Sequence, residues 1–324
     1  MKWWIMSYVF SEFLKKWLEE TDLSRKDLIE LLQNLNFEEF KGLDNITLSR
    51  WENGKTIPPL YKQLYIAKCL GVDLKKFVIV MNSSSLKVTS KLSKVLSILT
   101  STLDHSLLSL SYDRIPDRVY CLIKKQTFDE HSSYFSDFHN NICAMESIFS
   151  EIYKLGNKVN YESIILKNQN DQKIGHYCGI RDLSPLKNTS LFKSLSEDEL
   201  KKGALINVGY FTSSKHFFEL LDYAICYYLL TAYKEKQNLY LFVGGNHIYN
   251  ITKHLLGIEE EKYYPPKSKN SKLGVYLFKI DILKAICNPL LLPSVQKKLA
   301  CLNQCHLTSC DMCNLKEFKQ STDI

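Results

Sequence analysis

The stretch 238–264, NLYLFVGGNHIYNITKHLLGIEEEKYY, sets the fold class of the larger part of the chain. Its first six residues, NLYLFV, are an apolar and β-prone run that predicts a strand. After the Gly-Gly pair, NHIYNITKHLLG predicts a short helix that a glycine ends. EEEKYY then predicts another strand, so the whole stretch predicts a strand–turn–helix–strand unit.

The segments on both sides of this unit continue the alternation of strands and helices. Strands are predicted at RVYCLIKK (118–125), YESIILKN (161–168), KIGHYCGI (173–180), GALINVGYF (203–211) and GVYLFKIDI (274–282). Helices are predicted at FDEHSSYFSDFHNNI (128–142), at MESIFSEIYKLG (145–156) and from 214 to about 236. The resulting order is βααβββαβαββ, which predicts a mixed α/β domain.

That order of elements resembles the GNAT acyltransferase fold over roughly residues 116–285. The stretch 238–264 looks like the family's strand, Asn-bearing turn, helix and glycine that precede its last two strands. KIGHYCGI lies where the family has an Ile-Gly pair in its third strand. The resemblance implies a site for an acyl-CoA donor.

The loop that would bind acyl-CoA departs from the family pattern. The family uses Arg/Gln-x-x-Gly-x-Gly/Ala before the long helix, because glycines let backbone N–H groups approach the pyrophosphate. Here the segment is FTSSKHFFELL, without a glycine after Gly209, and Phe217 is expected to crowd the approach. We therefore expect acyl-CoA binding to be disfavoured.

Hydroxyls, a helix N-terminus and a lysine charge could still bind an anion or another ligand at this place. The candidate ligand-binding residues are Thr212, Ser213, Ser214, Lys215 and Asn246. The alternative interpretation is a helix cap with a solvated lysine. Tyr210, His247 and Tyr249 are candidate catalytic groups, but each is interpreted as structural, and no catalytic residue is assigned.

The N-terminal 80 residues predict a bundle of short helices. Ser24 and Asp44 can cap the second and third helices, and Gly54 ends the third. GLDNITLSRWENGKTIP (42–58) resembles the Cro/CI-type (XRE family) helix-turn-helix, and the resemblance covers roughly residues 8–78. About nine extra residues, QNLNFEEFK, precede Gly42, where the family has a tight turn.

The resemblance implies a recognition helix that reads duplex DNA from the major groove. Arg50, Asn45 and Ile46 would contact base edges, whereas Arg25, Asn53 and Lys55 match positions that hold phosphates. The predicted DNA-binding set is Arg25, Asp44, Asn45, Ile46, Ser49, Arg50, Asn53 and Lys55. Residues 1–80 contain 12 Lys/Arg against 11 Asp/Glu, a net charge of only +1. Any electrostatic attraction must therefore come from local placement.

Four cysteines close to the C-terminus suggest a metal site. Cys301, Cys305, Cys310 and Cys313 have the spacing C-x3-C-x4-C-x2-C, which would suit a tetrahedral Zn²⁺. An iron–sulfur cluster uses the same ligands and remains an alternative, as do reactive thiols or a tail without a special role.

Composition sets the remaining limits. The chain has 324 residues, 45% of them hydrophobic and 24% charged, and its ten cysteines without an evident export signal favour a reducing, cytoplasmic compartment. No run is long and apolar enough for a membrane span.

The sequence thus predicts an α+β multidomain protein. Its parts are a helix-turn-helix bundle (1–80), a helical connector (81–115), a GNAT-like domain (116–290) and a Cys-rich tail (291–324). The predicted function is a DNA-binding transcriptional regulator, with a degenerate GNAT-like domain for sensing a small-molecule effector or for oligomerisation, which would act as a homodimer. The alternatives are an acyl-CoA-dependent acyltransferase with an atypical cofactor loop, and a scaffold without ligand chemistry.

Overall fold

The computed structural model describes residues 9–84, 86–105, 119–266, 274–304 and 315–322. The chain divides into two compact units, Met1–Leu86 and Lys87–Ile324, and each is considered by itself. No helix in these described ranges is long and apolar enough to cross a membrane.

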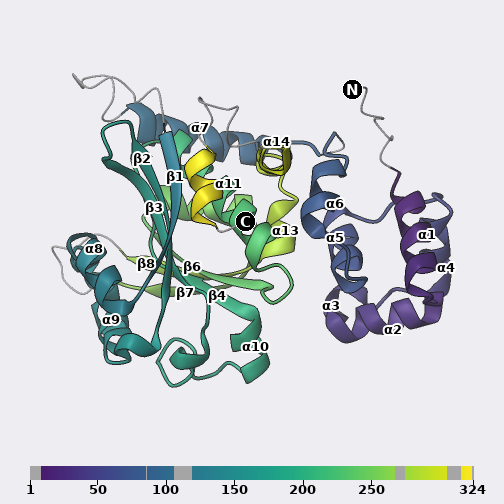
Figure 1. The fold of residues 1–324 in the computed structure, drawn as a ribbon, viewed down its shortest axis with the longest axis horizontal. Coiled ribbons are helices and arrows are strands. Elements are labelled where there is room, and N and C mark those ends of the chain that lie inside the picture. Colours follow the sequence, from purple (N-terminus) through teal and green to yellow (C-terminus); the bar gives the residue numbers. More distant parts are fainter. Residues whose placement is uncertain (1–8, 85, 106–118, 267–273, 305–314, 323–324) are drawn as a thin grey trace. The chain divides into compact units, whose positions relative to one another are not determined.

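The described part of the N-terminal unit contains only helices (Figure 1). They are α1 (Phe10–Thr21), α2 (Arg25–Leu35), α3 (Phe37–Phe40), α4 (Asn45–Glu52), α5 (Leu60–Cys69) and α6 (Leu74–Val80). Ser24 and Asp27 form a reciprocal capping box at α2, and the Asp44 side chain accepts a hydrogen bond from the Thr47 amide at α4. The extra residues before Gly42 extend α2 to Leu35 and then form α3, whose Phe40 is buried.

The apolar faces of these helices make one core. Leu14, Leu48 and Leu64 are fully buried, and the rings of Trp17 and Phe77 lie 5.0 Å apart in an edge-on contact. The apolar positions at helical spacing therefore point inward, as amphipathic helices require.

The second unit surrounds one sheet with helices (Figure 1). Its strands are β1 (Val119–Gln126), β2 (Tyr161–Asn168), β3 (Lys173–Ile180), β4 (Gly203–Ile206), β5 (Tyr210–Phe211), β6 (Asn238–Gly244), β7 (Ile258–Tyr264) and β8 (Val275–Asp281). Its α-helices are α7 (Ser90–His105), α8 (Phe128–Asn140), α9 (Glu146–Tyr153), α10 (Glu197–Lys202), α11 (Ser214–Thr231), α12 (Asn246–Leu256), α13 (Ile282–Ile286), α14 (Leu292–Gln304) and α15 (Lys316–Ser321).

The strand order is β1-β2-β3-β4-β6-β8-β7, and the short β5 also pairs with β3. All neighbouring strands are antiparallel except β4 and β6, which are parallel and are connected through α11. The prediction of a mixed α/β domain is confirmed, but the order of elements differs from the predicted one, because α10 precedes β4 and the expected strand 203–211 forms both β4 and β5.

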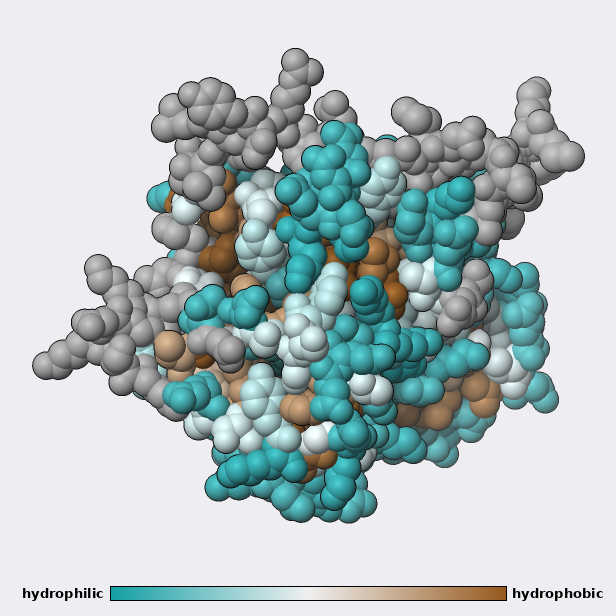
Figure 2. Space-filling model, turned by 60° about the vertical axis from the view of Figure 1, so that its left-hand side comes forward, coloured by the Kyte–Doolittle hydropathy of each residue, from teal (hydrophilic) through white to brown (hydrophobic). Residues whose placement is uncertain are grey.

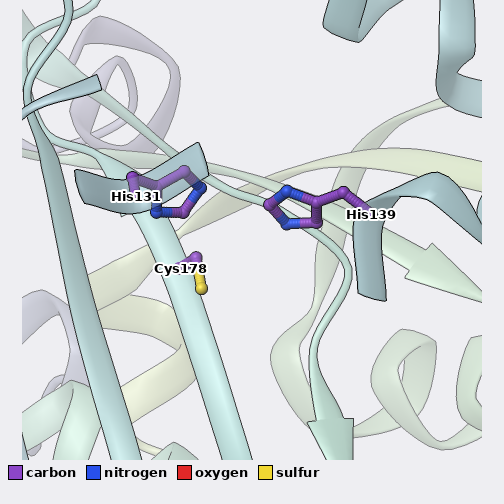
Figure 3. A group of neighbouring side chains, drawn as sticks. All are labelled: His131, His139 and Cys178. Atoms are coloured by element: carbon purple, nitrogen blue, oxygen red, sulfur yellow. The ribbon is translucent and has the colours of Figure 1, made fainter. Parts of the chain in front are cut away.

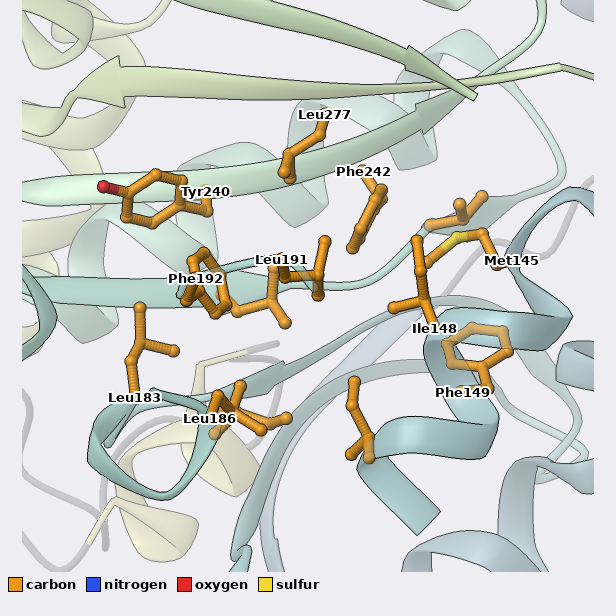
Figure 4. Packing of buried hydrophobic residues seen from close by; sticks show 14 of the residues in the cluster. Met145, Ile148, Phe149, Leu183, Leu186, Leu191, Phe192, Tyr240, Phe242 and Leu277 are labelled. Atoms are coloured by element: carbon orange, nitrogen blue, oxygen red, sulfur yellow. The ribbon is translucent and has the colours of Figure 1, made fainter. Parts of the chain in front are cut away.

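Helices cover both faces of the sheet. On one face, α9 and the loops around residues 183–192 enclose an apolar core with the side chains of β6 and β8 (Figure 4). Phe192, Tyr240 and Phe242 are buried there, and the Phe192 and Tyr240 rings lie 5.0 Å apart. On the opposite face, α11 and α12 cover the alternate residues, among them Leu239 and Leu241. This alternation follows from the two-residue period of a strand.

Two segments differ from the sequence-based expectation. GALINVGYF is not one strand: it bends at 207–209, so that β4 and β5 are separate. Part of the expected Cys-rich tail is structural, because α14 packs against α11 and buries Leu292, Val295 and Leu299. On the face that Figure 2 turns forward, the described side chains are mainly hydrophilic, with smaller apolar areas between them.

Candidate functional site

The two parallel strands separate at their carboxyl ends. β4 pairs with β6 from Gly203↔Asn238 to Ile206↔Leu241. Beyond the bend, β5 pairs with β3 instead, whereas β6 stays paired with β8 as far as Gly244. Ligands in α/β sheets bind outside the carboxyl ends of parallel strands, where neighbouring strands diverge. This opening is therefore the best candidate site in the fold.

The bend that opens the site is built from Asn207, Val208 and Gly209. The Asn207 amide donates to the Cys178 carbonyl at 2.8 Å, which holds the bend to β3. A Cβ on Gly209 would lie 2.3 Å from the Tyr177 ring, so only glycine fits there. The Asn207 side chain is buried, and its oxygen has no hydrogen-bond partner among the described residues. The bend therefore contains a buried polar atom without a partner among the described residues.

The N-terminus of α11 follows directly. The Ser213 hydroxyl caps the helix by accepting from the His216 amide at 3.2 Å. The Thr212 hydroxyl contacts the Ile174 carbonyl at 3.3 Å and His216 Nδ1 at 2.8 Å. Lys215 is exposed. The structure therefore brings Thr212, Ser213, Ser214 and Lys215 together at one helix end.

A carboxylate from α7 already occupies this helix end. The Ser214 amide donates to Asp104 Oδ1 at 2.8 Å, and the Ser214 hydroxyl donates to Asp104 Oδ2 at 2.6 Å. The positive end of a helix dipole favours such an anion. Asp104 comes from 110 residues earlier in the chain, and the sequence analysis did not identify it because no local pattern links it to α11.

The expectation that Phe217 crowds the approach of a phosphate to the helix end is wrong. Phe217 is 2% exposed and packs into the core, with its ring 5.1 Å from that of Phe211. Residue 217 is on the first turn of α11 but faces inward, so the side chain that lies over the helix end is that of Asp104.

The other candidate groups lie around the same opening or beside it. Asn246 and His247 begin α12, but their side chains are outside the described part of the structure. The Tyr249 hydroxyl contacts Glu261 at 3.1 Å and Lys253 Nζ at 3.0 Å, so it is held between α12 and β7. Tyr210 is 37% exposed. Neither tyrosine is assigned a catalytic role.

The residues predicted to contact DNA are mostly exposed, but several are used within the protein. Arg25 Nε lies 2.5 Å from Glu52 Oε2, and hydrogen bonding to this carboxylate raises the arginine pKa. The Asn53 amide group donates to the Ser49 carbonyl at 2.9 Å. The exposed remainder consists of Asn45, Ile46, Arg50 and Lys55.

The predicted cysteine site falls largely outside the described residues. Cys301 is exposed on the last turns of α14. Cys305, Cys310 and Cys313 belong to the range 305–314, which the structure does not describe. The zinc site and its iron–sulfur alternative stay predictions.

No family model matches the chain, and no curated protein matches it. Two solved structures do. One is a candidate phosphinothricin N-acetyltransferase, with 9% identity, a TM-score of 0.30, and coverage of 49% of this chain and 98% of that one. The other is an N-acetyltransferase from Staphylococcus aureus Mu50, with 12% identity, a TM-score of 0.27, and coverage of 60% and 96%.

Both matching structures are N-acetyltransferases. The strand order of the second unit, with its parallel pair of β4 and β6, is that of a mixed α/β domain. The prediction of a DNA-binding transcriptional regulator is wrong: the comparisons found N-acetyltransferases, which fit the acyltransferase alternative better. The physical reason lies in residues 1–80. Their net charge is near zero, which gives little overall attraction to DNA phosphates. In addition, Arg25 is in an ion pair with Glu52 and Asn53 is hydrogen-bonded to Ser49, although both side chains were expected to bind phosphates. A single chain does not test the expected homodimer.

Proposed function

We propose that this protein is an acyltransferase that uses an acyl-CoA donor and acylates an amine. The separation of β4 from β6, directly beside the N-terminus of α11, is the observation that carries the proposal. An extended, partly apolar donor can enter between two diverging strands, while its phosphates meet a helix N-terminus.

The chain's own residues suggest how the donor would be held. Acyl-CoA would supply the acyl group as an activated thioester. The hydroxyls of Ser213 and Ser214, together with the amides of the first turn of α11, would bind its phosphates, and the exposed Lys215 would add positive charge. The bend at Asn207 would line the opening with its buried side-chain oxygen, which can accept a hydrogen bond.

Asp104 sets a condition on this fit. Its carboxylate forms hydrogen bonds to the Ser214 amide and hydroxyl, the groups that the phosphates would use. Two anions cannot share one helix end without repulsion. Donor binding therefore requires Asp104 to move away. We infer that this carboxylate, more than the missing glycines, is the main obstacle to donor binding.

Calorimetry with acetyl-CoA and longer acyl-CoAs tests the proposal on the full chain. Asp104→Ala should bind the donor about tenfold more tightly than the parent, because it removes the competing anion. Lys215→Glu, introduced into the Asp104→Ala variant, should weaken donor binding. Asp198→Ala is the matched control: it removes an exposed carboxylate on α10 that pairs with Lys202, and should leave affinity unchanged.

Release of free CoA thiol in the presence of a panel of primary amines tests the chemistry. Turnover by Asp104→Ala that exceeds turnover by the parent would support an acyltransferase. The absence of donor binding in both the parent and Asp104→Ala would contradict the proposal.

A further inference from the structure

Three side chains between α8 and β3 gather ligand atoms in a closed interior. His131 and His139 come from α8 and Cys178 from β3, and Figure 3 shows the two imidazoles across from each other with Cys178 beside them. Their ligand atoms all lie within 4.8 Å of one another. The exposed fractions are 1%, 3% and 0%, so solvent does not reach the cluster.

The local structure places these groups on facing surfaces. Residues 131, 135 and 139 follow each other at four-residue spacing, so they share one face of α8. His176 and Cys178 are two apart on β3 and point to the same side of the sheet. Phe135 packs against Cys178 and lies 4.7 Å, ring to ring, from His176, which shows that these two faces are in contact.

The histidines lack the partners that buried polar groups normally have. Both ring nitrogens of His131 and of His176, and Nε2 of His139, are buried without a hydrogen-bond partner in the described part of the chain. Buried polar atoms are almost always satisfied by protein, water or an ion. A ring stack with Tyr161, at 3.7 Å between centroids, fixes the His131 imidazole in this orientation.

Burial also keeps these groups in forms suited to a metal. It lowers the pKa of His131 to about 3 and that of His139 to about 4, so both imidazoles are neutral and have a free lone pair at neutral pH. Burial raises the pKa of the Cys178 thiol. A bound cation would compensate this effect, since a coordinating thiol loses its proton.

We propose that His131, His139 and Cys178 bind one zinc ion as its three protein ligands. Nitrogen and thiolate donors in a tetrahedron are the usual ligands of structural zinc. Zn–N and Zn–S bonds of about 2.1 and 2.3 Å place the ligand atoms about 3.5 Å apart, so the side chains close inward by roughly one ångström on binding. The site is separate from the cysteine tail and does not depend on the proposed acyl transfer.

The zinc ion would connect α8 to the middle of the sheet. His176 pairs in register with Tyr210 of β5, directly after the bend that opens the candidate acyl site. Because all three ligand side chains are buried, we assign the ion a structural role.

Titration of the metal-free full chain with Zn²⁺ and Co²⁺ tests the site. Cys301, Cys305, Cys310 and Cys313 are first replaced by serine, so that the tail cannot contribute thiolates. This background should bind about one equivalent of zinc, melt at a higher temperature when zinc is added, and show thiolate-to-cobalt absorption with Co²⁺.

Matched variants locate the ion. Cys178→Ala should lose the thiolate-to-cobalt band and bind zinc more than tenfold more weakly. Cys226→Ala should keep both properties, because Cys226 is equally buried but lies on α11. His139→Leu should behave like Cys178→Ala, and His254→Leu, on α12, should behave like the background. Far-UV circular dichroism confirms that each variant is folded.

The background protein alone can overturn the proposal. If it binds neither Zn²⁺ nor Co²⁺ and its melting temperature does not respond to zinc, there is no site at this place, whatever the variants do. Equal cobalt spectra for Cys178→Ala and Cys226→Ala would likewise exclude Cys178 as a ligand.

Discussion

Two groups of buried polar side chains, on opposite faces of the same sheet, differ in their hydrogen-bond partners. Between α11 and α14, Asp222 Oδ2 accepts hydrogen bonds from Lys298 Nζ at 2.8 Å and from the Ser294 hydroxyl. Between α8 and β3, His131, His139 and His176 bury ring nitrogens that have no partner among the described residues.

The difference separates a carboxylate with a charged partner at Oδ2 from imidazoles with no partner at the nitrogens named, although Asp222 Oδ1 also lacks a hydrogen-bond partner among the described residues. Burial raises the pKa of Asp222, and Lys298 opposes this by stabilising the carboxylate. Removing one member of such a pair leaves an uncompensated buried charge, which is strongly destabilising. An imidazole without a partner has no such interaction to lose, so its removal from the metal-free protein should cost little.

The largest effect is expected from Lys298→Met. This change leaves the Asp222 carboxylate buried without its cation and should lower the free energy of unfolding of the second unit by about 3–5 kcal/mol. Urea unfolding followed by far-UV circular dichroism measures it.

The protein supplies its own control for that measurement. All four tryptophans, Trp3, Trp4, Trp17 and Trp51, belong to the N-terminal unit. Tryptophan fluorescence should therefore show an unchanged transition for that unit. The double variant Asp222→Leu/Lys298→Met should recover most of the loss, and a double variant as unstable as the single one would mean that packing, not charge, is responsible.

A smaller effect should follow from pH in the same variant. Without Lys298, the raised pKa of Asp222 rises further, so the folded state binds a proton that the unfolded state releases at its ordinary pKa of 3.8. Stability then falls as pH rises through this window and increases as pH is lowered from neutral toward 3.8. Part of the deficit relative to the parent should disappear in urea titrations at mildly acidic pH. A deficit that does not change with pH would argue against an ionised Asp222.

The smallest effect is expected from His139→Leu in the presence of a chelator. Replacing a buried polar group that lacks a partner by an apolar one should raise the unfolding free energy by about 1 kcal/mol. The same urea titration measures it. Added zinc should reverse the order, stabilising the parent and not the variant. A clear loss of stability in the metal-free variant would show that the imidazole makes a favourable contact, and the contrast with Lys298 would then fail.

Much of the local structure could be predicted from the sequence, and the gaps have a common cause. The helix beginning after Ser24 and the strands at 161–168 and 173–180 lie where capping and apolar patterning predict them. Patterning did not predict the bend at Asn207–Gly209, because apolar, β-prone residues lie on both sides of it and the sequence analysis assigned one strand to the whole segment. The segment is divided because its first half, β4, pairs with β6, whereas its last residues, β5, pair with β3.

The candidate site was predicted in part. The residues Thr212 to Lys215 lie together at a helix N-terminus because they are adjacent in the chain. Asp104 was missed, since a side chain 110 residues away leaves no local signal. The N-terminal helices suggested a DNA-binding function by their resemblance to a family, and the comparisons corrected that conclusion.

The sequence by itself determined which side each residue takes within its own helix or strand. The four-residue spacing of His131 and Phe135 puts both on one face of α8, and the two-residue spacing of His176 and Cys178 does the same on β3. Only the tertiary structure decided that these two faces meet, and that Asp104 reaches Ser214. Periodicity is a property of neighbouring residues, whereas contacts between distant segments depend on how the whole chain buries its apolar surface.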